Sequence, residues 1–205
     1  MRSAACICLC FLFGCAHTQG SDTESAEGQD AASAILVEAQ TELGNFVLEI
    51  YPDKAPNTVS NFLRYVDEDF YEGGRFHRTV HSGNQPNDSV RIAVIQGDIS
   101  PARRADRYPA IALERTNLTG LEHVDGAVSM ARGDPDTASS SFFICVGDQP
   151  ELDFGGKRNP DGQGFAAFGV VVEGMDVVRA INRASAEGQN LAPPIGIHSM
   201  ARVEG

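Results

Sequence analysis

The apolar residues of this 205-residue chain occur in many short runs. Each run ends at a cluster of Gly, Pro, Asn or Asp, the residues that terminate strands and form turns. The runs that resemble strands are 75–80, 91–96, 126–131, 141–146 and 166–172. Many short strands with few helical segments favour a mainly β protein, and we predict a closed antiparallel barrel.

Two further patterns predict strands at the start and the end of this domain. Ile35, Val37 and Ala39 alternate with more polar neighbours, and the alternation resumes at Phe46 after a turn near 42–45, which indicates a hairpin. A second alternating stretch, 195–203, predicts a closing strand.

Two segments are expected to be helices that cover the ends of the barrel. Pro56 begins the first, with Asn57 or Thr58 available as the N-cap. Its apolar residues fall at helical spacing and form one stripe: Val59, Phe62, Leu63 and Val66. The second helix is predicted to begin near Gly174.

The first fifteen residues have the pattern of an export signal. Arg2 precedes an apolar run that is too short to span a bilayer and that ends at Cys15. Leu12-Phe13-Gly14-Cys15 resembles the bacterial lipoprotein box, so we predict a signal peptide at 1–14 and a lipid attached to Cys15. The alternative is an ordinary secretory signal, cut near Gly14-Cys15-Ala16, that releases a soluble periplasmic protein.

Residues 15–34 then form a polar, acidic stretch without apolar periodicity, which predicts a disordered tether before a domain at 35–205.

The composition limits the partners that this chain can bind. The formal net charge is −12, and an acidic protein repels phosphate backbones, so we expect no nucleic acid partner. Four of the five cysteines lie in the signal region, and the fifth, Cys145, is expected to be a buried, unreactive thiol. The five histidines show no metal-ligand spacing, and we predict neither a metal nor a cofactor.

The candidate site combines one cation with amide and aromatic side chains. Arg78, Gln96 and Phe143 come from separate strand-like runs, and no nucleophile, metal set or phosphate loop accompanies them. Phe142 and Phe143 point to opposite faces of a strand, and we assign Phe142 to the core and Phe143 to the groove. An apolar groove with one fixed cation suits a reaction that makes no covalent bond, such as rotation about a peptide bond.

Several ordered motifs resemble those of the cyclophilins, a family of barrel-shaped peptidyl-prolyl isomerases. Phe76-His77-Arg78 and Ile95-Gln96-Gly97-Asp98 are two of them, and the others lie at 41–45, 55–62, 70–75, 126–132, 141–144, 152–153 and 168–171. The resemblance implies an eight-stranded barrel capped by two helices.

By the same resemblance, Arg78 matches the catalytic residue of the family. The positions that correspond to its substrate pocket are Phe76, His77, Gln96, Ala131, Arg132, Ser141, Phe143, Leu152 and Phe165. For His77 we favour a structural role, because proline isomerisation requires no proton transfer.

The chain departs from the family pattern in ways that bear on activity. A polar insert follows Arg78 at 81–90, and Ala93 and Val94 stand where larger residues usually form the floor of the proline pocket. Ser141 replaces a glutamine, Glu151 a frequent tryptophan, and Phe165 a His or Tyr. A shallower pocket is expected.

The resemblance implies an isomerase that acts on proline-containing unfolded or extended polypeptides. Together with the export signal, it predicts a monomer that acts on proteins of the cell envelope, faces the periplasm and is held to the membrane through its lipid anchor alone. Two alternatives follow from the departures: a peptide-binding holdase with weak or lost isomerase activity, and an envelope lipoprotein whose barrel is only a scaffold.

Overall fold

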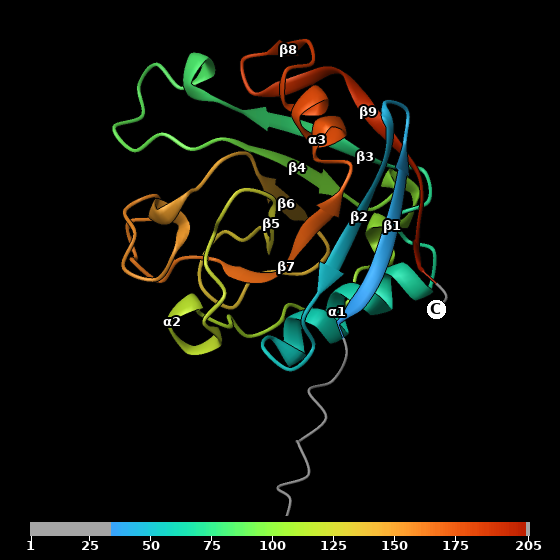
Figure 1. Cartoon of the computed structure of the whole chain (residues 1–205), viewed down its shortest axis with the longest axis horizontal. Coiled ribbons are helices and arrows are strands. Elements are labelled where there is room, and N and C mark those ends of the chain that lie inside the picture. Colours follow the sequence, from blue (N-terminus) through green and yellow to red (C-terminus); the bar gives the residue numbers. More distant parts are fainter. Residues whose placement is uncertain (1–33, 204–205) are drawn as a thin grey trace, which may run out of the picture. The chain divides into compact units, whose positions relative to one another are not determined.

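The computed structural model describes residues 34–203 of the chain. The predicted signal peptide, the lipidation site Cys15 and the tether lie outside these residues. Eight antiparallel strands close a barrel in the order β1-β2-β7-β5-β6-β4-β3-β9, because β9 pairs back with β1 (Figure 1). They are β1 (Ile35–Thr41), β2 (Gly44–Ile50), β3 (Gly74–Val80), β4 (Val94–Asp98), β5 (Ala127–Met130), β6 (Phe142–Cys145), β7 (Ala166–Glu173) and β9 (Asn190–Arg202). The predicted fold is confirmed.

Helices α1 (Pro56–Asp67) and α3 (Met175–Asn182) lie at opposite ends of the barrel (Figure 1). Several short elements were not predicted. Among them are the one-turn helix α2 (Thr116–Thr119) and the two-residue strand β8 (Ala186–Glu187), which pairs with β9 outside the closed ring. In the described part of the chain, no helix is both long and apolar enough to cross a membrane.

The predicted N-cap of α1 is wrong. The helix begins at Pro56, and the Ala55 side chain provides no cap. The distant carboxylate of Glu114 takes this role and accepts the backbone N–H groups of Asn57 at 3.1 Å and of Thr58 at 2.8 Å. A carboxylate at this place satisfies free amide donors and complements the positive end of the helix dipole.

The barrel interior is filled by aromatic rings. Phe142 packs edge-on against Phe76 and against Phe62 of α1, with ring centroids 5.8 Å apart in both pairs. Gly97 of β4 lies beside these rings, and a Cβ atom there would come within 3.0 Å of Phe142 and 3.1 Å of Phe76. Only glycine lets β4 approach the packed rings this closely.

A second, smaller group of apolar side chains covers the outer face of β3, β4, β5 and β6. We call it the outer cluster, and its buried members are Val80, Ile92, Val94, Ala127, Phe143, Cys145 and Leu152. Phe142 and Phe143 therefore lie on opposite sides of the sheet, as side-chain alternation predicts. The expected burial of Cys145 is also observed, and burial raises the pKa of its thiol.

Two strands begin several residues away from their predicted starts. β4 begins at Val94 instead of residue 91, because side chains satisfy much of the backbone that precedes it. Gln85 bonds both the carbonyl and the N–H of Ile92, and Gln149 accepts the N–H of Ala93. The closing strand β9 begins at Asn190, earlier than its alternation suggested, because its first residues pair with β8 and then with β3.

Candidate functional site

One row of side chains crosses four adjacent strands on the outer face of the barrel. Arg78 of β3 lies opposite Gln96 of β4, Gln96 opposite Phe143 of β6, and Phe143 opposite Ser129 of β5. Residues paired across antiparallel strands point to the same side of the sheet. The strand register thus brings together side chains that are far apart in the sequence.

A β-bulge places Arg78 in this row. The register of β3 against β4 shifts between Phe76 and Arg78, so His77 is an extra residue in the strand. Without the bulge, Phe76 and Arg78 would share one face of the sheet. With it, Phe76 points into the barrel and Arg78 points outward.

The prediction that Phe76 contacts substrate is therefore wrong. Its side chain is fully buried and packs between Phe46 and Phe142 in the barrel interior. His77 and Ser141 also do not line the cavity beside Arg78. Ser141 lies behind Gln96, where its Oγ accepts a hydrogen bond from Gln96 Nε2 at 3.0 Å and donates to the Gly97 carbonyl.

The cavity has a volume of about 150 Å³. Apolar cavities of about this size accept a small ring. One unpredicted residue, Ile92, borders it together with eight residues that the sequence analysis named: Arg78, Val94, Gln96, Ala131, Arg132, Phe143, Leu152 and Phe165.

Ile92 corrects the expected floor of the cavity. Ala93 does not border the cavity, whereas Ile92 and Val94 do. Because side chains alternate along an extended chain, Ile92, Val94 and Gln96 share one face and Ala93 points away from it. The apolar floor is consequently larger than the pair Ala93 and Val94 suggested, and the expectation of a shallow pocket rested on the wrong residue.

The Arg78 guanidinium is held from two sides. Gln96 Oε1 accepts a hydrogen bond from Nη1 at 3.0 Å, and Gln189 Oε1 accepts from Nε at 3.0 Å and from Nη2 at 2.6 Å (all distances between heavy atoms). An arginine carries five N–H donors, so one N–H on each terminal nitrogen is left for a ligand. Burial, followed by the charge of Arg158, lowers the pKa of Arg78, which nonetheless stays cationic at neutral pH.

Gln189 was missed by the sequence analysis. It lies in the turn between β8 and β9, 111 positions after Arg78, and carries no local signal of function. The insert supports it: Asn84 donates to the carbonyl of Gly188 at 3.0 Å, and Gln189 donates to the carbonyl of Asn84 at 3.4 Å. The start of the insert therefore braces the turn that holds Arg78.

Phe143 is fixed by a stack of rings and a buried polar chain. The His123 ring lies parallel to Phe143, with centroids 5.8 Å apart, and Phe165 meets Phe143 edge-on at 5.3 Å. His123 is itself held between Asp153 Oδ1 at 2.7 Å and Ser129 Oγ at 2.9 Å. Ser129 is fully buried, so this Ser–His–Asp chain cannot present a nucleophile, and it acts as a support for the cavity wall.

Arg132 borders the cavity, but its guanidinium is bonded to the loop that contains Asp161 and Gly164. It donates to both carboxylate oxygens of Asp161, at 2.8 and 3.0 Å, and to the carbonyl of Gly164. These hydrogen bonds lower the pKa of Asp161. The guanidinium also lies over the Phe165 ring, 5.0 Å from its centroid, so Arg132 positions Phe165.

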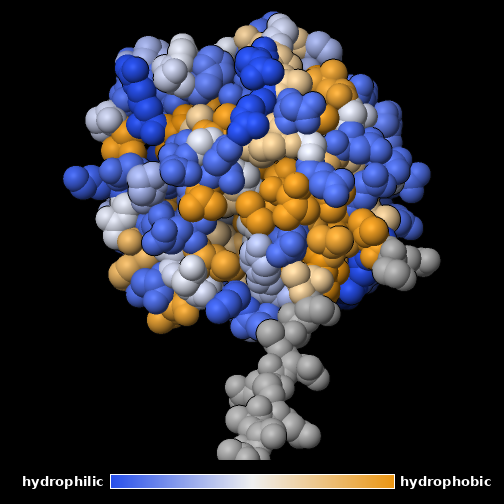
Figure 2. All heavy atoms as spheres, viewed as in Figure 1, coloured by the Kyte–Doolittle hydropathy of each residue, from blue (hydrophilic) through white to orange (hydrophobic). Residues whose placement is uncertain are grey.

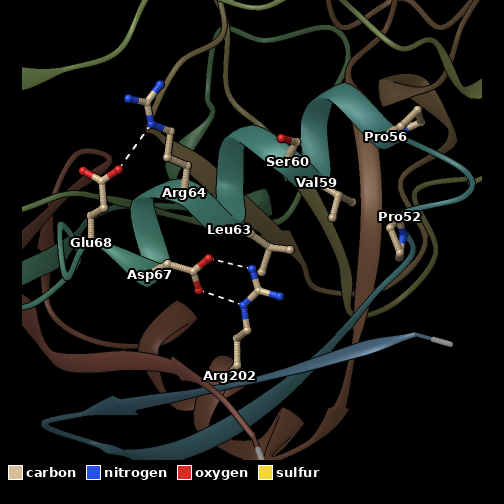
Figure 3. Close-up of a pocket in the computed structure, with 9 residues that line it drawn as sticks. All are labelled: Pro52, Pro56, Val59, Ser60, Leu63, Arg64, Asp67, Glu68 and Arg202. Carbon is tan, nitrogen blue, oxygen red and sulfur yellow. Dashed lines mark hydrogen bonds and ion pairs between the residues drawn. The ribbon is translucent and has the colours of Figure 1, made fainter. Parts of the chain in front are cut away.

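Two other hollows lack these features. The hollow along α1 has a volume of about 510 Å³, but its arginines are paired, Arg202 with Asp67 at 2.6 and 2.7 Å and Arg64 with Glu68 at 3.3 Å (Figure 3). Figure 2 shows a mostly hydrophilic face with apolar side chains gathered over the β1–β2 hairpin. The hollow there has no aromatic lining residue. Among residues 34–203, no three His, Cys, Asp or Glu side chains cluster closely enough to hold a metal ion.

Comparison with known proteins decides the family. The family described as cyclophilin type peptidyl-prolyl cis-trans isomerase/CLD matches residues 36–202. The chain belongs to the cyclophilin-type peptidyl-prolyl cis-trans isomerases. The enzyme class expected from the sequence, an isomerase, is confirmed with it.

Individual relatives agree with this family. The chain is 37% identical to a peptidyl-prolyl cis-trans isomerase of Acinetobacter baylyi over 74% of its own length and 73% of the relative. It is 36% identical to peptidyl-prolyl cis-trans isomerase B of Escherichia coli over 71% of its own length and 83% of the relative. A crystal structure of a cyclophilin type isomerase of Cryptosporidium parvum has the same fold, with a TM-score of 0.67 at 19% identity, and the match covers 84% of this chain and 99% of that one.

Proposed function

We propose that this chain catalyses the cis–trans isomerisation of X-Pro bonds in exported polypeptides, with Arg78 as its catalytic residue. The observation that carries the proposal is the Arg78 guanidinium, bound by two glutamines beside a cavity that has an aromatic and aliphatic wall and a volume that suits a small ring. No cofactor is needed, because the reaction makes and breaks no covalent bond.

The chemistry requires a donor that favours the twisted peptide bond. Rotation must overcome a resonance barrier of about 18–20 kcal/mol. In the twisted state the proline nitrogen regains its lone pair, and an N–H aimed at that lone pair stabilises the twisted state more than either planar state. One remaining N–H of Arg78 fills this role, and the second is available for a substrate carbonyl.

The cavity wall strengthens this effect. Phe143, Leu152 and Ile92 offer apolar surface to the proline ring. They exclude water from the neighbourhood of the guanidinium, and a charge acts more strongly where the local dielectric constant is low. Gln96 and Gln189 are neutral acceptors, so they orient Arg78 without cancelling its charge.

The direct test replaces Arg78. Arg78→Ala should lower kcat/KM for a cis-proline peptide by about tenfold or more, the effect expected for losing one preorganised donor. Arg78→Lys keeps the charge but not the two fixed N–H groups. Its kcat/KM should be much nearer to that of Arg78→Ala than to that of the parent. Exposed Arg91, directly after the insert, provides the control, since Arg91→Ala removes equal charge at a residue that does not line the cavity. Unchanged turnover in a folded Arg78→Ala protein would rule out this assignment.

The cellular setting is part of the proposal. The signal-like segment ending at Cys15 supports a monomeric lipoprotein that faces the periplasm and acts on extended proline-containing chains. Mass spectrometry of the mature protein tests this: a diacylated or triacylated N-terminal Cys15 is expected. A mature protein that begins at another residue, without a lipid, would support the soluble periplasmic form.

The holdase alternative is tested by exchange spectroscopy on a proline peptide. Its support in the sequence is a small pocket floor made of Ala93 and Val94, whereas Ile92 and Val94 are the residues that border the cavity. Peptide shifts that appear without faster cis–trans exchange would favour the holdase over the enzyme.

A further inference from the structure

Two loops form one end of the Arg78 cavity, and Arg158 joins them. The first loop is the insert, which continues into Ile92, and the second follows Leu152. Arg158 Nη1 donates to the carbonyl of Val90 at 2.7 Å and pairs with Asp88 at 3.2 Å. The backbone N–H of Arg158 bonds the carbonyl of Glu151, directly before Leu152. Arg158 is thus anchored beside two residues that line the cavity.

The charges at this end of the cavity are unbalanced. The residues that line it include two arginines, Arg78 and Arg132, but no Asp or Glu. Asp161 compensates Arg132, while the glutamines that hold Arg78 carry no charge. Burial is the main cause of the lowered pKa of Arg78, and the positive charge of Arg158 is the second cause.

Asp88 is a weak counter-ion for this pair of cations. Its side chain is 40% exposed, whereas that of Arg158 is 17% exposed. Exposed ion pairs contribute little free energy, so another carboxylate can replace Asp88 at small cost. Nε and Nη2 of Arg158 have no hydrogen-bond partner among residues 34–203, which leaves donors for a bidentate contact.

We propose that Arg158 selects X-Pro substrates that carry a carboxylate next to the proline, and that this carboxylate takes the place of Asp88. The inference rests on the proposed function, because it names the substrate class of the same site. The insert then has a second role: it supplies the internal carboxylate that occupies Arg158 when no acidic substrate is bound.

The test compares peptides that differ in one residue. Glu and Gln are placed directly before the proline in one pair and directly after it in another, and kcat/KM is measured by exchange spectroscopy at low ionic strength. In at least one pair, Glu should exceed Gln by about fivefold, a ratio set by a partly exposed, charge-assisted contact. The ratio should fall towards one in about 1 M salt, where the Debye length is about 3 Å.

Three variants separate Arg158 from general electrostatics. Arg158→Gln should bring the Glu:Gln ratio to about one. Asp88→Asn removes the competing carboxylate and should raise the ratio above that of the parent. Arg91→Gln removes an exposed charge directly after the insert and should keep the parent ratio. A parent ratio of one or less at both positions, or an unchanged ratio in Arg158→Gln, would overturn the proposal.

Binding measurements distinguish this failure from failure of the proposed function. The same peptides are titrated and their Kd values are taken from chemical-shift changes, which require no turnover. Loss of exchange catalysis with all peptides would refute the enzyme proposal, while a Glu:Gln ratio in Kd that depends on Arg158 would still support the selectivity. Equal Kd values for Glu and Gln peptides would count against the selectivity in either case.

Discussion

Gln189 accepts two hydrogen bonds from Arg78 through a single oxygen atom, at 3.0 Å from Nε and 2.6 Å from Nη2. This contact fixes the plane of the guanidinium, because the two nitrogens lie on the same edge of the group. It also joins β3 to the β8–β9 turn, two segments that no local sequence pattern connects.

We therefore expect Gln189 to position the catalytic residue. Gln189→Leu has a similar size but accepts no hydrogen bond, and should lower kcat by about tenfold, corresponding to about 1.4 kcal/mol of lost transition-state stabilisation. Peptide Kd should change much less than kcat, since the cavity wall is intact. Gln189→Glu keeps an acceptor at the same place but adds a negative charge beside Arg78, so it should recover only part of the lost kcat. An unchanged kcat in Gln189→Leu would show that the side-chain oxygen is not what matters.

Ile92 is expected to determine how well the proline ring is gripped. Ile92→Ala should raise the peptide Kd several-fold and destabilise the fold by about 2 kcal/mol, at the low end for a buried isoleucine because the insert can partly collapse into the space. Titration and denaturant unfolding measure these two effects. Ala93→Ser is the matched control. If it lowers the affinity as much as Ile92→Ala does, Ala93 and not Ile92 forms the floor of the cavity.

Glu114 should stabilise the domain through the first turn of α1. Glu114→Gln keeps the shape of the side chain but removes its charge, and a charged cap at a helix N-terminus typically contributes about 1 kcal/mol. Urea unfolding should show a loss of this size. The same change at exposed Glu122 should leave the free energy of unfolding within error of the parent. No difference between the two variants would mean that the negative charge of Glu114 contributes nothing to the stability of α1.

His77 should make the domain less stable at mildly acidic pH. Burial lowers the pKa of His77 below its ordinary value of 6.5, against the opposing charge of Asp98. Between these two pKa values the unfolded chain binds a proton that the folded chain does not, so stability falls as the pH drops below about 6.5. His77→Gln should show a smaller drop in Tm between pH 7.5 and pH 5.5, while the exposed His198→Gln should show the full drop of the parent.

The sequence was sufficient for the barrel, its helices and most of the cavity. Alternation places Phe142 inside and Phe143 outside, and the structure agrees, because no irregularity interrupts β6. The same rule fails for Phe76 and Arg78, because the bulge at His77 reverses the alternation between them. Bulges leave no clear signal in a single sequence, so only the structure shows that Phe76 lies on the inner face of the sheet.

The remaining errors concern contacts between distant segments. Ile92 could have been found, since it continues the spacing of Val94 and Gln96 by two residues. Gln189 and Arg158 could not, because their roles arise when turns far apart in the chain meet at one end of the cavity. Glu114 likewise replaces a local cap by a carboxylate 56 positions from Thr58.

The sheet of the barrel separates the side chains that pack the core from those that border the cavity. On strand β6, Phe142 packs in the barrel interior and Phe143 borders the cavity beside Arg78, although the two residues are neighbours in the chain. Mutations that retune recognition can therefore accumulate on one side of this wall while the other side keeps its packing. The peptide preference of such a protein can therefore change during evolution while its fold stays the same.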